Sequence, residues 1–164
     1  MTDPVELLIS KGLTIAVAES LTGGALVARL IDTPGASAAV LGGVVAYNTE
    51  LKHTVLGVPA SVLAPHGPVD PDVARAMAAG VRTALAVGGV PADVGLATTG
   101  VAGPDPQDGQ PVGTVWIGLA IGDRVDAHLV ELSGTRADIR SQAVDAAIAI
   151  LLAGLSEYSA GHRE

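Results

Sequence analysis

The feature that most constrains this chain is the alternation of short apolar runs with segments of helical periodicity. Three apolar runs are typical of buried strands: TIAVAE (14–19), AAVLGGVVAY (38–47) and ADVGLATTG (92–100). Segments with helical periodicity lie between them, at 23–32, at 49–56 and from Asp70 to about residue 85. Such alternation predicts helices that cover both faces of a largely parallel sheet.

The two ends of the chain extend this pattern. A helix is expected at 4–11, and TVWIGLAIG (114–122) with RVDAHLVEL (124–132) resembles a hairpin around Gly122-Asp123. A last helix is expected from about 135 to 157, and loops are expected around Pro59, Pro65 and Pro68 and at 101–113. We therefore predict a single domain over 1–164, a three-layer α/β/α sandwich on a mixed, mostly parallel sheet with a late β-hairpin.

Composition excludes several classes of function. The net charge of −8 and the lack of a Lys/Arg cluster argue against nucleic-acid binding. The absence of Cys removes thiol nucleophiles and disulfides, and the four histidines lack the spacing of metal ligands. The apolar stretch at 146–155 has about half of the roughly 20 residues that a membrane span needs, and the N-terminus does not resemble a signal peptide. These features favour a soluble, cytoplasmic protein without metal.

The core must be built almost without aromatic residues. The chain is 49% hydrophobic but contains no Phe, so Ala, Val, Leu and Ile have to fill the interior. Small aliphatic side chains favour close packing of helices on the sheet. The high mean hydropathy also implies apolar surface, and we expect a homo-oligomer.

The first candidate site is AESLTGG (18–24), where a strand ends at Glu19 and a helix begins near Thr22. Ser20 would lie at the carboxyl end of that strand, where α/β sheets bind ligands. Free N–H groups at the helix start would suit a phosphate or a carboxylate. The stretch fits neither the P-loop, nor the dinucleotide-binding, nor the G-x-S-x-G pattern. An anion site and an ordinary capped turn therefore both remain open.

The second candidate is AYNTELKHTVLG (46–57), which contains one of the two lysines of the chain. Lys52 would either lie along the surface with its ammonium in water or be desolvated. A desolvated lysine has a lowered pKa and can act as a base toward a hydroxyl group. Tyr47 could orient that lysine or donate to a substrate. The pattern does not decide between these interpretations.

Two further stretches carry groups that suit an anionic ligand. In TTGVAGP (98–104), Thr99 ends a strand and the glycines that follow allow backbone N–H groups to face a ligand, although a tight turn explains them equally well. In SGTRADIR (133–140), Arg136 and Arg140 share a face near a helix start, where the helix dipole disfavours cations. The arginine pair therefore requires an anionic partner, either a phosphate or an Asp or Glu side chain.

Taken together, these stretches resemble the CinA C-terminal domain family, the nicotinamide mononucleotide deamidases. The corresponding blocks are AESLTGG, GGVVAYNTELKHTVLGV, HGPVDPDVARAMAAG, TTGVAGP, PVGTVWIGLA and SGTRADIR, in this order, from about residue 5 to residue 152. The resemblance implies an α/β sandwich that hydrolyses the amide of nicotinamide mononucleotide to nicotinate mononucleotide and ammonia, without a cofactor. It further implies that Ser20 is the nucleophile, that Lys52 is its base, and that Tyr47 and Thr99 complete the polar site.

The resemblance also implies a set of substrate-binding residues, in which Gly-rich turns and arginines hold the phosphate or ribose. These residues are Thr22, Gly23, Gly24, Asn48, Gly100, Ala102, Gly103, Arg136 and Arg140. At Asn48 the chain departs from the family, because many members have Ser directly after the Tyr; the Asn side chain can hydrogen-bond a carboxamide. Members are often fused to an N-terminal domain related to molybdopterin-binding proteins, and this chain is expected to be a stand-alone form without that activity.

Two other functions remain open at this point. A noncatalytic nucleotide-binding or regulatory module could have kept the pocket and lost turnover, which Asn48 would favour. An amidase for another small carboxamide would need the same nucleophile and base but not the phosphate contacts.

Overall fold

The computed structural model describes residues 2–159. Its strands are β1 (Ile15–Glu19), β2 (Val40–Val45), β3 (Val94–Gly100), β4 (Thr114–Ile121) and β5 (Arg124–Glu131). Its helices are α1 (Pro4–Lys11), α2 (Ala25–Ile31), α3 (Thr49–Thr54), α4 (Ala60–His66), α5 (Pro71–Ala84) and α6 (Arg136–Glu157), with a 3₁₀ turn, η1 (Ala36–Ala38).

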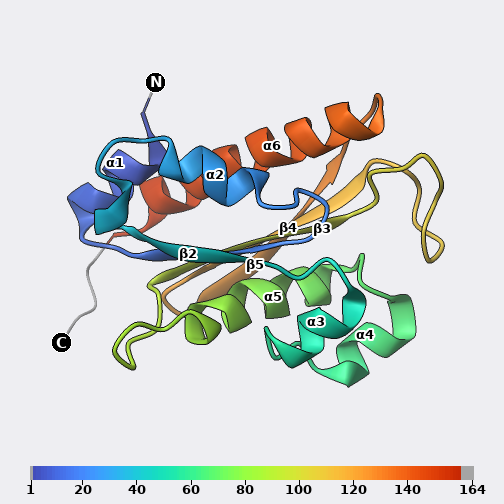
Figure 1. The fold of residues 1–164 in the computed structure, drawn as a ribbon, viewed down its shortest axis with the longest axis horizontal. Helices are drawn as coiled ribbons and strands as arrows, with labels where there is room; N and C mark the ends of the chain where they lie inside the picture. The colour runs from blue at the N-terminus through green and yellow to red at the C-terminus, as the bar shows by residue number, and fades with distance from the viewer. Residues whose placement is uncertain (1, 160–164) are drawn as a thin grey trace.

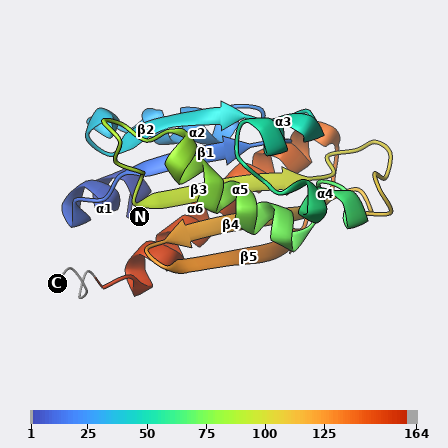
Figure 2. The same cartoon turned by 90° about the horizontal axis from the view of Figure 1, so that it is seen from below.

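The strands form one mixed sheet in the order β2-β1-β3-β4-β5 (Figure 2). β1 pairs in parallel with both β2 and β3, whereas β4 pairs antiparallel with both β3 and β5. Among the described strands, only β4 therefore runs against the common direction. The mixed, mostly parallel sheet and the late hairpin predicted from the sequence are both confirmed.

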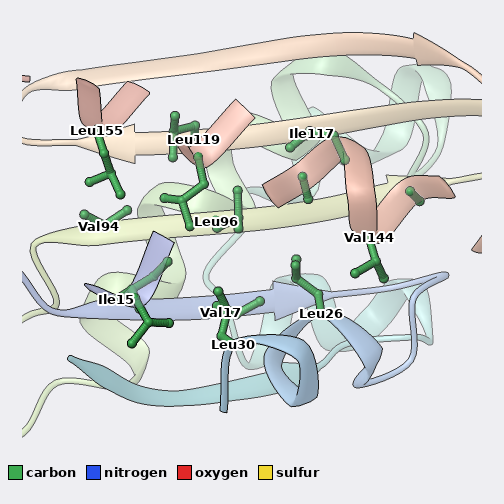
Figure 3. Close-up of a cluster of buried hydrophobic side chains, with 14 of the residues drawn as sticks. Ile15, Val17, Leu26, Leu30, Val94, Leu96, Ile117, Leu119, Val144 and Leu155 are labelled. Carbon is green, nitrogen blue, oxygen red and sulfur yellow. The ribbon is translucent and has the colours of Figure 1, made fainter. Parts of the chain in front are cut away.

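Helices cover both faces of this sheet, which confirms the three-layer α/β/α arrangement. α1, α2 and α6 lie on one face, and α3, α4 and α5 lie on the other (Figure 1). Successive residues of a strand point to opposite faces. Ile15 and Val17 of β1 accordingly pack in the cluster beneath α2 and α6 (Figure 3), and Ala16 and Ala18 pack in the cluster beneath α5.

α5 lies unusually close to the sheet because glycines face it. A Cβ atom added at Gly95 of β3 would lie 1.9 Å from the carbonyl oxygen of Ala78, and one added at Gly118 of β4 would lie 2.1 Å from that of Ala74. Both alanines belong to α5. The core without Phe is thus closed by direct approach of helix and sheet backbones.

The prediction of a loop around Pro59 and Pro65 is wrong, because α4 forms there. Pro59 is the N-cap residue of α4, and Pro65 lies in its last turn. A proline at the N-cap costs no helical hydrogen bond, since the first N–H groups of a helix lack partners in any case. No residue of α4 is buried, so the helix covers the surface rather than filling the core.

α6 is the one helix of the described chain long and apolar enough to cross a membrane by length and composition, with a mean hydropathy of 1.4. In the structure it lies along the sheet (Figure 1) and buries one stripe, which includes Ile139, Ala143, Ala147 and Leu151. A stripe with this spacing is what a helix needs to close one layer of the core.

Candidate functional site

A serine and a lysine meet where β1 ends. Ser20 directly follows β1, and Lys52 lies on α3, which follows β2. The Lys52 Nζ atom lies 3.0 Å from the Ser20 Oγ atom and 2.7 Å from the carbonyl oxygen of Ala46. Both distances are within hydrogen-bond range. Lys52 is buried, with 1% of its surface exposed.

Strand alternation and a helix cap explain how the two side chains come together. Ala16 and Ala18 face the α5 side of the sheet, so continued alternation directs Ser20 to the same side, where α3 also lies. α3 begins at its N-cap Asn48, whose Oδ1 atom accepts a hydrogen bond of 2.9 Å from the Glu50 N–H group. Lys52 follows about one helical turn later. Asn48 therefore orients the helix that carries Lys52.

Burial gives Lys52 the properties of a base. Desolvation lowers the pKa of its ammonium group from 10.5 to about 8, because the charged form loses its hydration. Among the ion pairs of residues 2–159, none joins Lys52 to a carboxylate that would oppose this effect. A neutral amine can donate to the Ala46 carbonyl and accept the Ser20 hydroxyl proton at the same time. The buried interpretation of Lys52 thus replaces the surface one.

The Ser20–Lys52 pair lines a cavity of about 190 Å³ at the carboxyl ends of the parallel strands. Tyr47 and Arg136 stand on its wall, and Arg136 donates a hydrogen bond of 3.0 Å to the Tyr47 hydroxyl and another to the Gly103 carbonyl. Thr99 donates to the Pro68 carbonyl at 2.7 Å. Of the residues expected from the sequence, the cavity brings together Ser20, Tyr47, Lys52, Thr99, Gly100, Ala102, Gly103 and Arg136.

The other expected residues do not line this cavity. They are Thr22, Gly23, Gly24, Asn48 and Arg140. Thr22 hydrogen-bonds the Thr98 hydroxyl at 2.9 Å, and Asn48 caps α3 as described. Arg140 donates to the backbone carbonyls of Leu21 and Thr22, at 2.8 and 3.3 Å. Two backbone carbonyl groups therefore take the place of the anionic partner that was expected for Arg140.

The start of α2 also differs from the sequence interpretation. Its N–H groups at Leu26 and Val27 donate to the two carboxylate oxygens of Glu19, at 2.9 and 3.1 Å. The chain's own carboxylate therefore occupies the helix start that the Gly-rich turn suggested for a substrate anion. Of the two interpretations left open for AESLTGG, the capped turn describes this backbone.

Several cavity residues were not identified from the sequence. They are Leu21, Thr49, Pro68, Val69, Val101, Asp105 and Gln107. Asp105 and Gln107 belong to the loop at 101–113, whose polarity in an apolar chain was a usable signal. Pro68 carries no such signal, because only the tertiary fold brings it to Thr99. Within residues 2–159, no three Asp, Glu or His side chains gather closely enough to hold a metal ion.

The α/β fold that carries this site is shared by known proteins. The sequence model of the CinA C-terminal domain matches residues 2–155, so the chain belongs to the CinA C-terminal domain family. A CinA-like protein of Frankia casuarinae is 52% identical over 152 residues, which is 91% of this chain. A putative competence-damage inducible protein of Desulforamulus reducens is 50% identical over 87% of this chain. The chain spans about a third of the length of each, 34% in both cases.

Solved structures agree with this assignment. The CinA superfamily protein of Klebsiella pneumoniae superposes with a TM-score of 0.88 at 33% identity, over 95% of this chain and 96% of the other. The CinA superfamily protein of Escherichia coli gives a TM-score of 0.82 at 31% identity, over 90% of this chain and 83% of the other.

Proposed function

We propose that this protein hydrolyses the carboxamide of nicotinamide mononucleotide, giving nicotinate mononucleotide and ammonia. The observation that carries the proposal is the 3.0 Å contact between Ser20 Oγ and the buried Lys52 Nζ inside the cavity. Amide hydrolysis needs a nucleophile and a proton acceptor of suitable pKa, and a serine–lysine pair supplies both without His or Cys. The substrate is inferred from membership in the CinA C-terminal domain family.

In the first half of the reaction, the Ser20 oxygen attacks the carbonyl carbon of the amide while neutral Lys52 takes the hydroxyl proton. The tetrahedral intermediate carries a negative oxygen that needs hydrogen-bond donors. Leu21, the residue after Ser20, lines the cavity, and we assign its N–H group as a donor for that oxygen. Protonated Lys52 then gives its proton to the leaving nitrogen, and ammonia departs as the carbon–nitrogen bond breaks.

In the second half, water hydrolyses the resulting ester on Ser20. Lys52, again neutral, takes a proton from the water, and hydroxide adds to the ester carbonyl. Collapse of this intermediate breaks the bond to Ser20 Oγ, which recovers the proton from Lys52. The acid that forms releases its remaining proton to solvent and leaves as a carboxylate. The same lysine thus serves as base and acid in each half.

Substrate charge is matched by Arg136 rather than by Arg140. Arg136 lines the cavity, and a guanidinium has five N–H donors, so its contacts to Tyr47 and Gly103 leave donors for a phosphate. The Asp105 carboxylate lies on the same wall. It can accept hydrogen bonds from ribose hydroxyl groups, whereas its negative charge would repel the phosphate.

The test is ammonia release from nicotinamide mononucleotide by the purified protein. Ser20→Ala should lower kcat roughly 1,000-fold or more, as loss of a serine nucleophile does elsewhere. Ser10→Ala, which changes an exposed serine of α1, is the matched control and should keep full activity. Nicotinamide and its riboside, which lack the phosphate, should be poorer substrates than the nucleotide.

Three results would contradict this proposal in different ways. Nucleotide binding without turnover by the unmodified protein would indicate the noncatalytic module. Retained activity in Ser20→Ala would exclude the serine mechanism but leave the reaction. Equal turnover of nicotinamide and the nucleotide would indicate a general amidase for small carboxamides.

A further inference from the structure

Glu19 is a buried carboxylate that the proposed chemistry does not use. It is the last residue of β1, its exposed fraction is 0%, and its neighbour in the chain is Ser20. By strand alternation its side chain points to the α2 side of the sheet, away from Lys52. Its two oxygens accept hydrogen bonds from the N–H groups of Leu26 and Val27 at 2.9 and 3.1 Å.

These contacts make Glu19 the cap of α2. The N-cap position itself is Gly24, which has no side chain to satisfy the first N–H groups of the helix. A carboxylate that accepts two such bonds also complements the positive end of the helix. The strand end and the helix start are thereby joined, and the loop between them, Ser20 to Gly24, has both of its ends held.

Arg140 of α6 binds the middle of the same loop. Its Nε and Nη2 atoms, reaching from α6, donate to the carbonyls of Leu21 and Thr22. Gly23 has φ +61, and a Cβ atom there would lie 3.3 Å from Arg140 Nη2, so the loop also fits closely around the guanidinium. The carbonyl groups of Leu21 and Thr22 are thus oriented by a cation, while Glu19 fixes the helix beyond them.

We propose that Glu19 and Arg140 are positioning residues, which together hold the Ser20–Gly24 loop so that Ser20 Oγ stays within hydrogen-bond distance of Lys52 Nζ. Neither side chain lines the cavity of Ser20 and Lys52, which supports a role through the loop rather than through the substrate. The kinetic part of this inference rests on the proposed function. A misplacement of the nucleophile by about 1 Å can cost on the order of 100-fold in rate, whereas the binding walls formed by Tyr47, Asp105 and Arg136 would stay in place.

Glu19→Gln tests the first of these residues. The amide retains the size of the side chain but presents one NH₂ group to a backbone N–H donor, so one of the two caps is lost. The expected result is a kcat lowered roughly 10- to 100-fold with KM within about twofold. Asp3→Asn is the matched control, because Asp3 is also a carboxylate that caps a helix, α1, by accepting from two N–H groups, those of Val5 and Glu6. It should leave kcat and KM unchanged.

Arg140→Lys tests the second residue by keeping the charge and removing the planar fork. As a positioning residue Arg140 should again affect kcat and not KM, whereas a contact with substrate phosphate would raise KM. Arg29→Lys, at an exposed arginine of α2 paired with Asp145, is the control. A raised KM with unchanged kcat in Arg140→Lys would overturn the positioning role.

A readout without substrate separates this inference from the proposed function. An alkyl fluorophosphonate reacts with an activated serine: the Ser20 oxygen bonds to phosphorus, fluoride leaves, and Lys52 takes the proton. The rate of labelling at Ser20, followed by mass spectrometry, should fall roughly tenfold or more in both variants and in neither control.

Labelling at the rate of the unmodified protein in variants that unfold cooperatively in urea would overturn the inference. If Glu19→Gln does not fold, the labelling rate of Arg140→Lys alone tests the inference. Slower labelling of the variants in a protein without nucleotide turnover would refute the proposed function and support the positioning role.

Discussion

Replacing Lys52 with Met should make the protein more stable and inactive. Met has nearly the length of the lysine side chain but no charge, and the side chain at this position is buried. The prediction follows from the cost of keeping an ammonium group in that position. It opposes the usual expectation that a substitution at a buried position destabilises a protein.

The magnitude comes from the pKa of Lys52, which burial lowers from 10.5 to about 8. Below pH 8 the protonated lysine therefore costs the folded state roughly 3 kcal/mol relative to an unshifted group. Met removes this cost but leaves the Ala46 carbonyl without its lysine donor, a loss of about 1–2 kcal/mol. The net expectation is a gain of about 1–2 kcal/mol near pH 7.

The pH dependence of this gain is the sharper test. Between pH 8 and 10.5 the unfolded state binds the proton that folded Lys52 has released, so the contribution of Lys52 to stability rises with pH in that window. The advantage of Lys52→Met should therefore shrink as the pH rises from 8 to 10.5 and be lost above it. Urea unfolding at several pH values from 7 to about 10.5 measures this difference.

Lys11→Met is the matched control for this experiment. Lys11, the second lysine of the chain, also donates to a backbone carbonyl, that of Tyr158 at 3.0 Å, but it is only partly buried. Its replacement should give no gain in stability near pH 7. A Lys52→Met variant that is less stable than the unmodified protein at pH 7, or whose stability difference does not change with pH, would refute the desolvation argument.

Two further predictions follow from the same structure. The kcat/KM of the proposed amide hydrolysis should rise with pH and level off above about 8, because only the neutral amine of Lys52 can take the Ser20 proton and about a tenth of it is neutral at pH 7. Initial rates of ammonia release between pH 6 and about 9.5 measure this profile, and a rate that falls through pH 8 would exclude Lys52 as the base. Gly95→Ala should destabilise the fold by about 2 kcal/mol or more, because its Cβ atom would lie 1.9 Å from the Ala78 carbonyl oxygen of α5. Thermal unfolding measures this loss, and a change below about 0.5 kcal/mol would mean that α5 moves away from the sheet without cost.

Local patterns in the sequence determined most of the architecture. Apolar runs and helical periodicity predicted the strands and most of the helices, and N-cap and turn residues such as Asp70 and Gly12 marked their ends. These signals are local because the periods of strands and helices are fixed by backbone geometry. α4 escaped this reasoning because Pro65, a residue that normally argues against a helix, lies inside its last turn.

Local patterns in the sequence predicted only part of the candidate site. Family blocks singled out Ser20 and Lys52, but no spacing rule stated that an oxygen and a nitrogen 32 residues apart lie 3.0 Å from each other. The lowered pKa of Lys52 likewise depends on every element that excludes water from it, so no single stretch of sequence could have predicted it.

AESLTGG shows the division most clearly. Local patterns in these residues are enough to predict that a strand turns there into a helix and that Ser20 stands at the strand's carboxyl end. The packing of distant elements, by contrast, is what leads Glu19, and not a ligand, to accept from the first N–H groups of α2 and Arg140 to bind the loop carbonyls. The physical reason is competition for the same polar groups: backbone N–H and C=O groups take whichever buried partner the packed layers bring within reach, and that choice is made between elements distant in the chain.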